Sequence, residues 1–192
     1  MTVLIPHPTE ELIFAKLQKE LITELFEDGR IMYAVKPLWV EVGGGFDTAS
    51  GLLNHRGDEI SFADVTLNSR DLTTNLTGCT KVALLAATIG PQVDALIRRH
   101  STVNPVYASI LQATGAMFIE EVVDLVNDEI KKIAASQGLK TKPRYSPGFG
   151  DVPLEVQKDF FRLLPCTRIG LTLMDTLIMA PEKSVTAFVG LF

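Results

Sequence analysis

The feature that most constrains the fold is a long helical pattern from about residue 105 to residue 136. Asn104 is a favourable N-cap, Pro105 is a favourable first residue, and Gly138 suits the left-handed position beyond the C-terminus. A straight helix of this size measures about 48 Å at 1.5 Å per residue. Its apolar positions fall on one face at 100° per residue: Leu111, Phe118, Ile119, Val122, Val126, Ile130 and Ile133. We expect this face to be buried and Gly115 to bend or weaken the helix locally.

Three carboxylates near the middle of the predicted helix differ in their position relative to the apolar face. Glu120 and Asp124 lie nearly opposite that face, and we expect them to be solvated. Glu121 lies at the border, about 100° from the centre of the face. A border carboxylate can be partly buried and still reach a ligand, so Glu121 is a candidate site residue. An ordinary boundary glutamate is the alternative interpretation.

The remaining pattern predicts helices and strands in an irregular order. Helices are expected over 9–29, from Pro91 onward and over 154–164, and a short helix or turn near 69–79 with Ser69 or Asp71 as cap. Strands are expected over 30–42, 80–90, near 171–175 and over 184–192, with turns at 43–45 and 180–183. Pro37 indicates an edge or a bend in its strand. Without a βαβ repeat, this order predicts one α+β domain over residues 1–192, with a mostly antiparallel sheet and a long helix.

Composition excludes several functional classes. The chain of 192 residues is 46% hydrophobic and 21% charged, which is typical of a soluble globular protein. Its net charge of −5 argues against nonspecific nucleic-acid binding, which requires a basic face. The N-terminal stretch lacks the features of a signal peptide, and apolar runs such as 82–87 are far shorter than a membrane span. We therefore expect a cytoplasmic protein without nucleic-acid or membrane partners.

Neither a metal site nor a set of catalytic side chains is predicted. Cys79 and Cys166 are far apart in apolar surroundings, and we interpret them as reduced, buried residues. His7, His55 and His100 have no partner at metal-ligand spacing. The sequence also lacks a P-loop and a nucleophile elbow, and His55 is not in the Asp-x-His-x-x-Gly context of cobalamin-carrying domains. A standalone enzyme with strong side-chain chemistry is therefore not expected.

The stretch "RYSPGFGDVP" at 144–153 is the strongest candidate for a ligand-holding segment. It contains two glycines and two prolines, too many breakers for a helix or a central strand. It also carries an arginine and two aromatic residues, which a flexible linker does not need. We interpret it as a loop that holds a ligand.

The last third of the chain resembles the reactivation domain of cobalamin-dependent methionine synthase. That domain carries an Arg-x-x-x-Gly-Tyr motif for S-adenosylmethionine (SAM), and the stretch from Arg144 to Phe149 matches it except at its last position. A downstream family run ending in "Met-x-Pro-x-x-Ser-Val-Ser-Gly" is similar to residues 170–187 here. The resemblance is firm over 105–190 and weaker over 1–104, and it implies a small, separately encoded relative of that domain.

The resemblance implies a function in reductive methylation. A domain of this family binds SAM and docks on the cobalamin-binding domain of methionine synthase or another corrinoid protein. An electron from a flavodoxin-like donor then allows inactive cob(II)alamin to be converted to methylcobalamin. The cobalamin is held by the partner, and the domain supplies binding and orientation, without a catalytic residue or a metal of its own.

The resemblance also assigns SAM-binding residues. Arg144 offers a planar cationic fork for the SAM carboxylate, and Glu121 matches the family's SAM-contacting glutamate on the long helix. Free backbone N–H groups at Tyr145, Ser146, Gly148 and Phe149 are expected to read adenine or ribose. Gly148 lets a flat ligand approach the main chain, and Pro143 before the motif and Pro147 within it stiffen the loop.

Two alternatives stay open at this stage. Phe149 stands where the motif has tyrosine, and Asp175-Thr176-Leu177 replace Glu-Ser-Phe of the downstream run. These departures favour a noncatalytic protein that docks on a corrinoid protein without using SAM. A SAM-dependent methyltransferase with its own substrate is less favoured, because no Rossmann-type glycine motif follows a strand.

Overall fold

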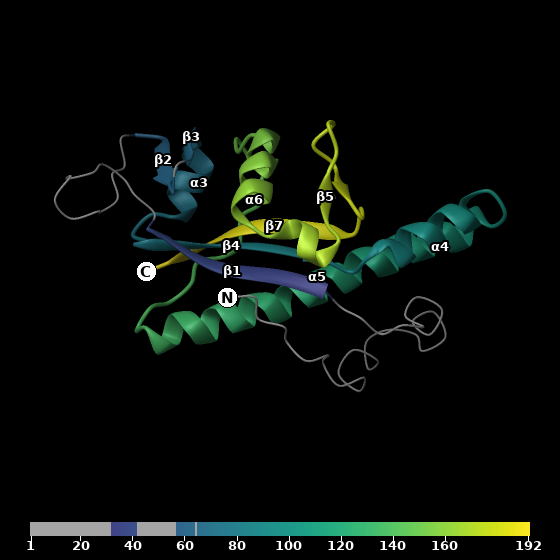
Figure 1. Cartoon of the computed structure of the whole chain (residues 1–192), viewed down its shortest axis with the longest axis horizontal. Helices are drawn as coiled ribbons and strands as arrows, with labels where there is room; N and C mark the ends of the chain where they lie inside the picture. The colour runs from purple at the N-terminus through teal and green to yellow at the C-terminus, as the bar shows by residue number, and fades with distance from the viewer. Residues whose placement is uncertain (1–31, 42–56, 64) are drawn as a thin grey trace.

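The computed structural model describes residues 32–41, 57–63 and 65–192. In this part of the chain a small antiparallel sheet lies between a long helix on one face and short helices and hairpins on the other (Figure 1). The arrangement confirms an α+β fold with antiparallel strand pairing. The helix predicted over 9–29 and the glycine turn at 43–45 lie outside the described residues.

The central sheet has three strands in the order β1-β4-β7, comprising Met32–Glu41, Lys81–Thr88 and Ser184–Leu191. Strand β4 pairs antiparallel with both neighbours. Its Thr88 lies opposite Met32 of β1, and its Lys81 lies opposite Leu191 of β7. Among the described strands β1 lies at an edge of the sheet, and its register shifts between Lys36 and Val40. Pro37 lies in this irregular stretch and has no N–H to donate, so the predicted edge or bend is confirmed.

Strand β4 is buried on both faces because a hydrophobic core lies on each side of the sheet. Val82, Leu84 and Ala86 belong to one core, and the alternate residues of the strand belong to the other. The continuous apolar run from 82 to 87 therefore reads as a strand covered on both sides, as the sequence predicts.

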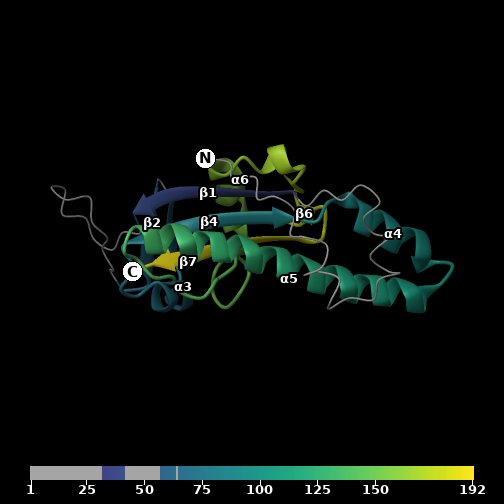
Figure 2. The same ribbon diagram turned by 90° about the horizontal axis from the view of Figure 1, so that it is seen from below.

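Helices α4 (Pro91–Ser101) and α5 (Pro105–Ser136) follow β4, and α5 extends along one face of the sheet (Figure 2). The predicted N-cap is confirmed, since Asn104 Oδ1 accepts a hydrogen bond of 3.1 Å from the Tyr107 N–H. Gly138 has a φ of 74°, as its predicted position beyond the helix end requires. The predicted apolar face is buried except for Ile133, which is half-buried.

The helix continues through Gly115, for which the structure supplies a packing reason. A Cβ at this position would lie 2.9 Å from Val93 Cγ1 of α4 and 3.3 Å from Lys183 Cε. The missing side chain therefore lets α4 and the turn before β7 approach α5 closely. Among the described helices, α5 is the one whose length and composition would allow it to cross a membrane, and here its buried residues pack in the core beneath the sheet.

The opposite face of the sheet carries the shorter elements. These are β2 (Glu59–Phe62), β3 (Val65–Asn68), α3 (Arg70–Asn75), the 3₁₀ turns η1 (Leu154–Val156) and η2 (Cys166–Ile169), α6 (Gln157–Leu163), β5 (Thr172–Leu173) and β6 (Met179–Ala180). Phe188 of β7 lies at the centre of this core, with ring centroids 4.8 Å from Phe160 and 5.3 Å from Phe62 in edge-to-face geometry. The short helix expected before Pro165 and the cap at Ser69 are both confirmed.

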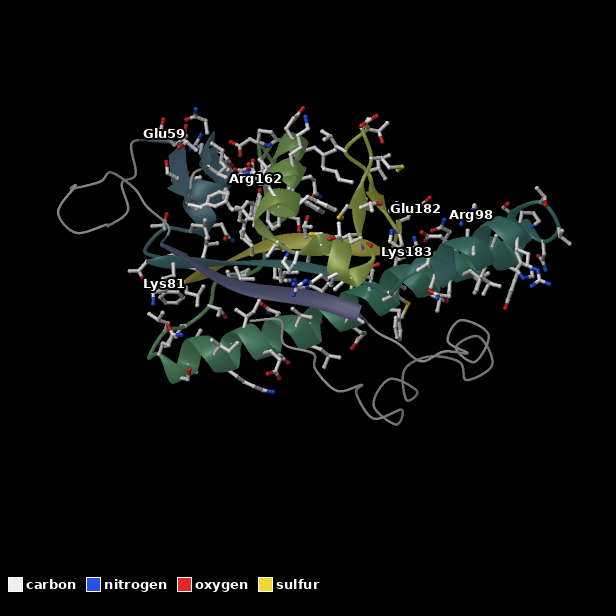
Figure 3. All side chains as sticks on the ribbon, in the orientation of Figure 1. Glu59, Lys81, Arg98, Arg162, Glu182 and Lys183 are labelled. Atoms are coloured by element: carbon white, nitrogen blue, oxygen red, sulfur yellow. The ribbon has the colours of Figure 1, made fainter. Side chains whose placement is uncertain are left out.

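The turn before β7 is tied to the start of α4. The Glu182 N–H donates a hydrogen bond of 2.7 Å to Oδ2 of the buried Asp94. Figure 3 shows Glu182 and Lys183 at this turn, between the β5–β6 hairpin and α4. Both cysteines are free and buried as predicted, and burial raises the pKa of the Cys166 thiol to about 11.

Candidate functional site

The stretch before the "RYSPGFGDVP" loop pairs along the free edge of β7. Lys140 and Phe192 exchange two backbone hydrogen bonds of 2.7 and 2.9 Å, and the Lys142 N–H donates to the Gly190 carbonyl at 2.8 Å. Tyr145 and Phe188 exchange two more, of 3.0 and 2.7 Å. This pairing covers a sheet edge that would otherwise present unpaired backbone groups.

Arg144 lies in a bulge of this pairing. From Lys142 to Tyr145 the chain advances three residues, whereas the β7 strand advances two between Gly190 and Phe188. One extra residue is therefore accommodated at Pro143 and Arg144. Pro143 suits this place because it has no N–H to leave unpaired, and its carbonyl accepts a hydrogen bond of 3.3 Å from Asn75 Nδ2 of α3.

The bulge brings the Arg144 side chain to the outer face of α5. Its Nη2 lies 3.3 Å from Glu120 Oε2, and its Nη1 forms a shorter contact with Asp124 Oδ1. The two carboxylates are four residues apart on the helix, so they lie on one side of it and the guanidinium fork contacts both. The arginine side chain is 23% exposed, and those of Glu120 and Asp124 are 61% and 63% exposed.

These ion pairs correct one part of the sequence interpretation. Glu120 and Asp124 are exposed, as predicted, but they are also the residues that pair with the motif arginine. Glu121, the predicted ligand contact, is exposed beside them on α5. Helical spacing correctly placed Glu120 and Asp124 away from the core, but it does not show that another segment returns to that side of the helix.

The loop uses most of the backbone N–H groups that the sequence interpretation left free. The Tyr145 N–H donates to Phe188, the Phe149 N–H to the Ser146 carbonyl at 3.3 Å, and the Gly148 N–H to the Val152 carbonyl at 3.0 Å. The expectation of free N–H groups is therefore wrong for Tyr145, Gly148 and Phe149. Within the described part of the chain, no such hydrogen bond occupies the N–H of Ser146.

Two glycines determine the shape of the turn that follows Arg144. Gly148 has a φ of 85°, and a Cβ there would lie 3.1 Å from Leu154 Cδ1. Gly150 has a φ of 55°, and a Cβ there would lie 2.2 Å from Asp71 Oδ2 and 2.3 Å from the Tyr145 hydroxyl oxygen. The left-handed backbone explains both glycines, and a side chain at Gly150 would additionally displace the Asp71 carboxylate and the Tyr145 hydroxyl.

Tyr145 connects the loop to α3. Its ring is half-buried against the core above the sheet, and its hydroxyl hydrogen-bonds to Asp71. Burial raises the pKa of Tyr145, and the negative charges of Asp71 and Asp151 raise it further. The protonated phenol is therefore the favoured state, and it serves as the donor toward Asp71.

Asp151 anchors the far end of the loop and was not singled out from sequence. Its carboxylate accepts hydrogen bonds from the Ser69 hydroxyl and from the N–H groups of Arg70, at 2.8 Å, and Asp71, at 3.3 Å. The Ser69 hydrogen bond is the main reason why the pKa of Asp151 lies below its ordinary value. Desolvation raises this pKa, and the hydrogen bonds from the two N–H groups lower it further. Asp151 thus reinforces the N-terminal cap of α3.

Phe149 is the most accessible aromatic group of the loop. It is 67% exposed, while the Pro147 ring beside it is buried. An exposed aromatic face next to a rigid turn suits stacking on a flat heterocycle. Ser146, Phe149 and the three carboxylates of α5 are therefore the groups of this region that remain accessible to a ligand.

Two buried amide oxygens, one on α3 and one on α5, lack a hydrogen-bond donor among the described residues. Asn75 Oδ1, on the side chain that contacts Pro143, and Asn127 Oδ1 of α5 are both buried without a partner among the described residues. Asn127 is seven residues from Glu120 and therefore lies on the same side of the helix.

Metal chemistry finds no support in the described residues, which contain no group of three or more ligand-type side chains placed to hold an ion. Comparisons of the chain with models of protein families and with curated proteins find no match. The function proposed below therefore rests on the motifs and on the geometry of the loop and α5.

Proposed function

We propose that this protein is a SAM-binding reactivation subunit that supports reductive methylation of cob(II)alamin in a cobalamin-dependent methionine synthase. The observation that carries the proposal is the position of Arg144. The bulge in the segment that pairs with β7 places the motif arginine against the acidic side of α5. Its partners Asp124 and Glu120 lie 20 and 24 residues earlier in the sequence. The motif arginine and the long helix, the two features that resemble the reactivation domain, therefore lie against each other.

The groups that remain accessible fit parts of SAM. The exposed Phe149 ring offers a stacking face for adenine, and the Ser146 N–H and hydroxyl offer polar contacts. The α5 carboxylates suit the α-ammonium and sulfonium groups. Arg144 has five N–H donors, of which the two ion pairs use two, so donors remain for a ligand carboxylate.

The chemistry itself belongs to the bound groups. In the proposed reaction the partner's cob(II)alamin takes one electron from a flavodoxin-like donor and the methyl group from SAM, which yields methylcobalamin and S-adenosylhomocysteine. The contribution of this chain is to hold SAM in a fixed orientation on a rigid loop. The hydrogen bonds of Tyr145 with Phe188 and of Asp151 with α3 provide that rigidity.

A direct test combines binding and turnover. The chain is titrated with SAM by calorimetry, alone and with a cob(II)alamin-loaded partner, and methylcobalamin formation is followed by its absorbance in the presence of a reductant. We expect SAM binding, and methylation that requires the chain. In Arg144→Ala, SAM binding should weaken by about tenfold, because the guanidinium donors proposed for the SAM carboxylate are lost. Absence of SAM binding at millimolar concentration, even with the partner present, would sink the proposal.

One observation favours a second candidate function. Three of the four backbone N–H groups expected to contact SAM are used within the loop, and Phe149 has no hydroxyl. A noncatalytic protein that docks on a corrinoid protein, without using SAM, agrees with both facts. This function would be favoured over the first if the chain captured the corrinoid protein equally well with and without SAM, and if Arg144→Ala did not change the amount captured.

A further inference from the structure

The first half of α5 carries an exposed apolar stripe on the side that faces away from the core. Val106, Ile110 and Met117 are exposed, as is the smaller Ala113 that lies between them. Their spacing of four, three and four residues places all four on one side of the helix. The sequence contains no charged residue from 101 to 119. Because a solvated helix face normally carries charges, this stripe is typical of a covered surface.

The described neighbours of this half of α5 pack on its other sides. Helix α4 contacts it through His100, whose ring centroid lies 4.8 Å from that of Tyr107, and through Val93 next to Gly115. Figure 2 shows that the hairpin of α4 and α5 projects beyond the end of the sheet. The exposure of the stripe shows that none of the described elements covers it.

The chain has a segment that starts from the right place to cover the stripe. Strand β1 begins at Met32, which lies opposite Thr88 of β4, three residues before Pro91 opens α4. Residues 1–31, which lie outside the described ranges, therefore join the sheet at the base of the α4–α5 hairpin (Figure 2). A tether holds such a segment at a local concentration on the order of millimolar, which favours it over a second copy or a separate partner.

The sequence of that segment matches the stripe in polarity and length. The pattern over 9–29 predicts an amphipathic helix with Leu17, Leu21 and Leu25 on one side, at spacings of four residues. At 1.5 Å per residue this helix measures about 31 Å and the stripe about 17 Å, so the helix is long enough to cover it. A helix of this kind is stabilised in a protein mainly by packing of its apolar side.

We propose that residues 9–29 pack along α5 as a third helix, with their leucine side against the apolar stripe. The contact requires neither SAM nor a partner protein, so the inference is independent of the proposed function. The stripe ends at Met117, three residues before Glu120, which pairs with Arg144. The segment would therefore border the surface on which Arg144 meets α5.

Hydrogen exchange of the full chain, followed by mass spectrometry, tests the contact without any substitution. Amides of a helix held against α5 are protected, so we expect residues 9–29 to exchange at least about a hundredfold more slowly than an unstructured chain. Exchange at the unstructured rate overturns the inference. Analytical ultracentrifugation identifies the occupant: protection in a monomer supports the inference, whereas protection that appears only in a dimer assigns the stripe to a second copy and overturns it.

Ile110→Glu and Ile178→Glu form a matched pair of variants. The two isoleucines are 48% and 52% exposed, but Ile178 lies on the β5–β6 hairpin, away from the stripe. We expect Ile110→Glu to remove the protection of residues 9–29 and to lower the melting temperature by about 5 °C or more, because it places a charge in an apolar contact. Ile178→Glu should keep the protection and shift the melting temperature by less than about 2 °C. Protection that survives in both variants contradicts the inference.

Leu21→Asp tests the same contact from the other side. Combined with Ile110→Glu it should add little further loss of stability, because both substitutions break one contact. Thr23→Asp is its control, since Thr23 lies 200° from Leu21 around the predicted helix and should not affect the protection. Should Ile110→Glu fail to fold, Ile110→Ser and Ile178→Ser give the same comparison. Fully additive losses for Leu21→Asp and Ile110→Glu would show that the two residues share no contact, which overturns the inference.

Discussion

The two ends of the "RYSPGFGDVP" loop are both held by carboxylates, but in different ways. At Asp151 one carboxylate accepts hydrogen bonds from the buried Ser69 and from backbone N–H groups at the start of α3. At Arg144 two exposed carboxylates of α5 pair with one guanidinium. The first end uses fixed donors of the fold, whereas the second uses long side chains in contact with solvent.

This difference separates a structural anchor from the end of the loop at which we propose that a ligand is recognised. Caps and backbone hydrogen bonds contribute measurably to stability, whereas exposed ion pairs contribute little, because water competes for them and side-chain freedom is lost. The Asp151 end therefore fixes the shape of the loop. The Arg144 end is able to exchange partners at small energetic cost, as the proposed recognition of a ligand requires.

Substitution at Gly150 should have the largest effect on stability. In Gly150→Ala the new Cβ meets Asp71 and Tyr145 at less than 2.5 Å, on a backbone with a φ of 55°. We expect a loss of about 2 to 3 kcal/mol of unfolding free energy, measured by chemical denaturation. The control variant is Gly170→Ala. Gly170 has a similar φ of 70°, but no atom lies within 4 Å of the new Cβ. We expect this variant to lose about 1 kcal/mol of unfolding free energy. Equal losses would show that close approach at Gly150 is unimportant.

Removing the Asp151 charge should have an intermediate, pH-dependent effect. The folded-state pKa of Asp151 lies below its ordinary value of 3.8, so the carboxylate stabilises the fold above that pH and loses this contribution as pH falls through the folded-state pKa. We expect Asp151→Asn to lower the melting temperature by a few degrees at pH 7. The difference from wild type should narrow in acid. A difference that does not depend on pH would argue against the charge-assisted cap.

Substitution at Arg144 should affect stability least. Its two partners are exposed, so Arg144→Ala is expected to cost less than about 1 kcal/mol of unfolding free energy, although it weakens SAM binding. Thermal unfolding measures the change in stability, and calorimetry on the same preparation measures SAM binding. A loss as large as that of Gly150→Ala would show that the Arg144 end is also a structural anchor, and the contrast between the two ends would disappear.

Local signals in the sequence predicted most of the fold. The caps of α5, the edge position of β1 and the double burial of β4 each depend on nearby residues, and each is confirmed. The hairpin of β2 and β3 was not predicted, although Ile60, Phe62, Val65 and Leu67 alternate in burial as strands require. Its turn contains Ala63 with a φ of 48° and none of the glycine or asparagine signals typical of hairpins.

The candidate site was less predictable because its contacts are distant in sequence. The bulge at Arg144 depends on the register against β7, which begins forty residues later, at Ser184. The partners of Asp151 lie 80 to 82 residues earlier in the chain. Motif and helical spacing identified Arg144 and the acidic helix, but they could not show which carboxylates the arginine meets or which loop N–H groups the fold uses.

The pairing of the loop with β7 also has a consequence for the order of folding. Strand β4 meets β7 only after a separation of about one hundred residues, from Lys81–Thr88 to Ser184–Leu191, and contacts this distant are slow to form. The Tyr145–Phe188 hydrogen bonds cannot form before β7 has docked. Any partly folded form that lacks β7 therefore lacks the paired loop as well, so the proposed capacity to bind a ligand arises together with the completed sheet.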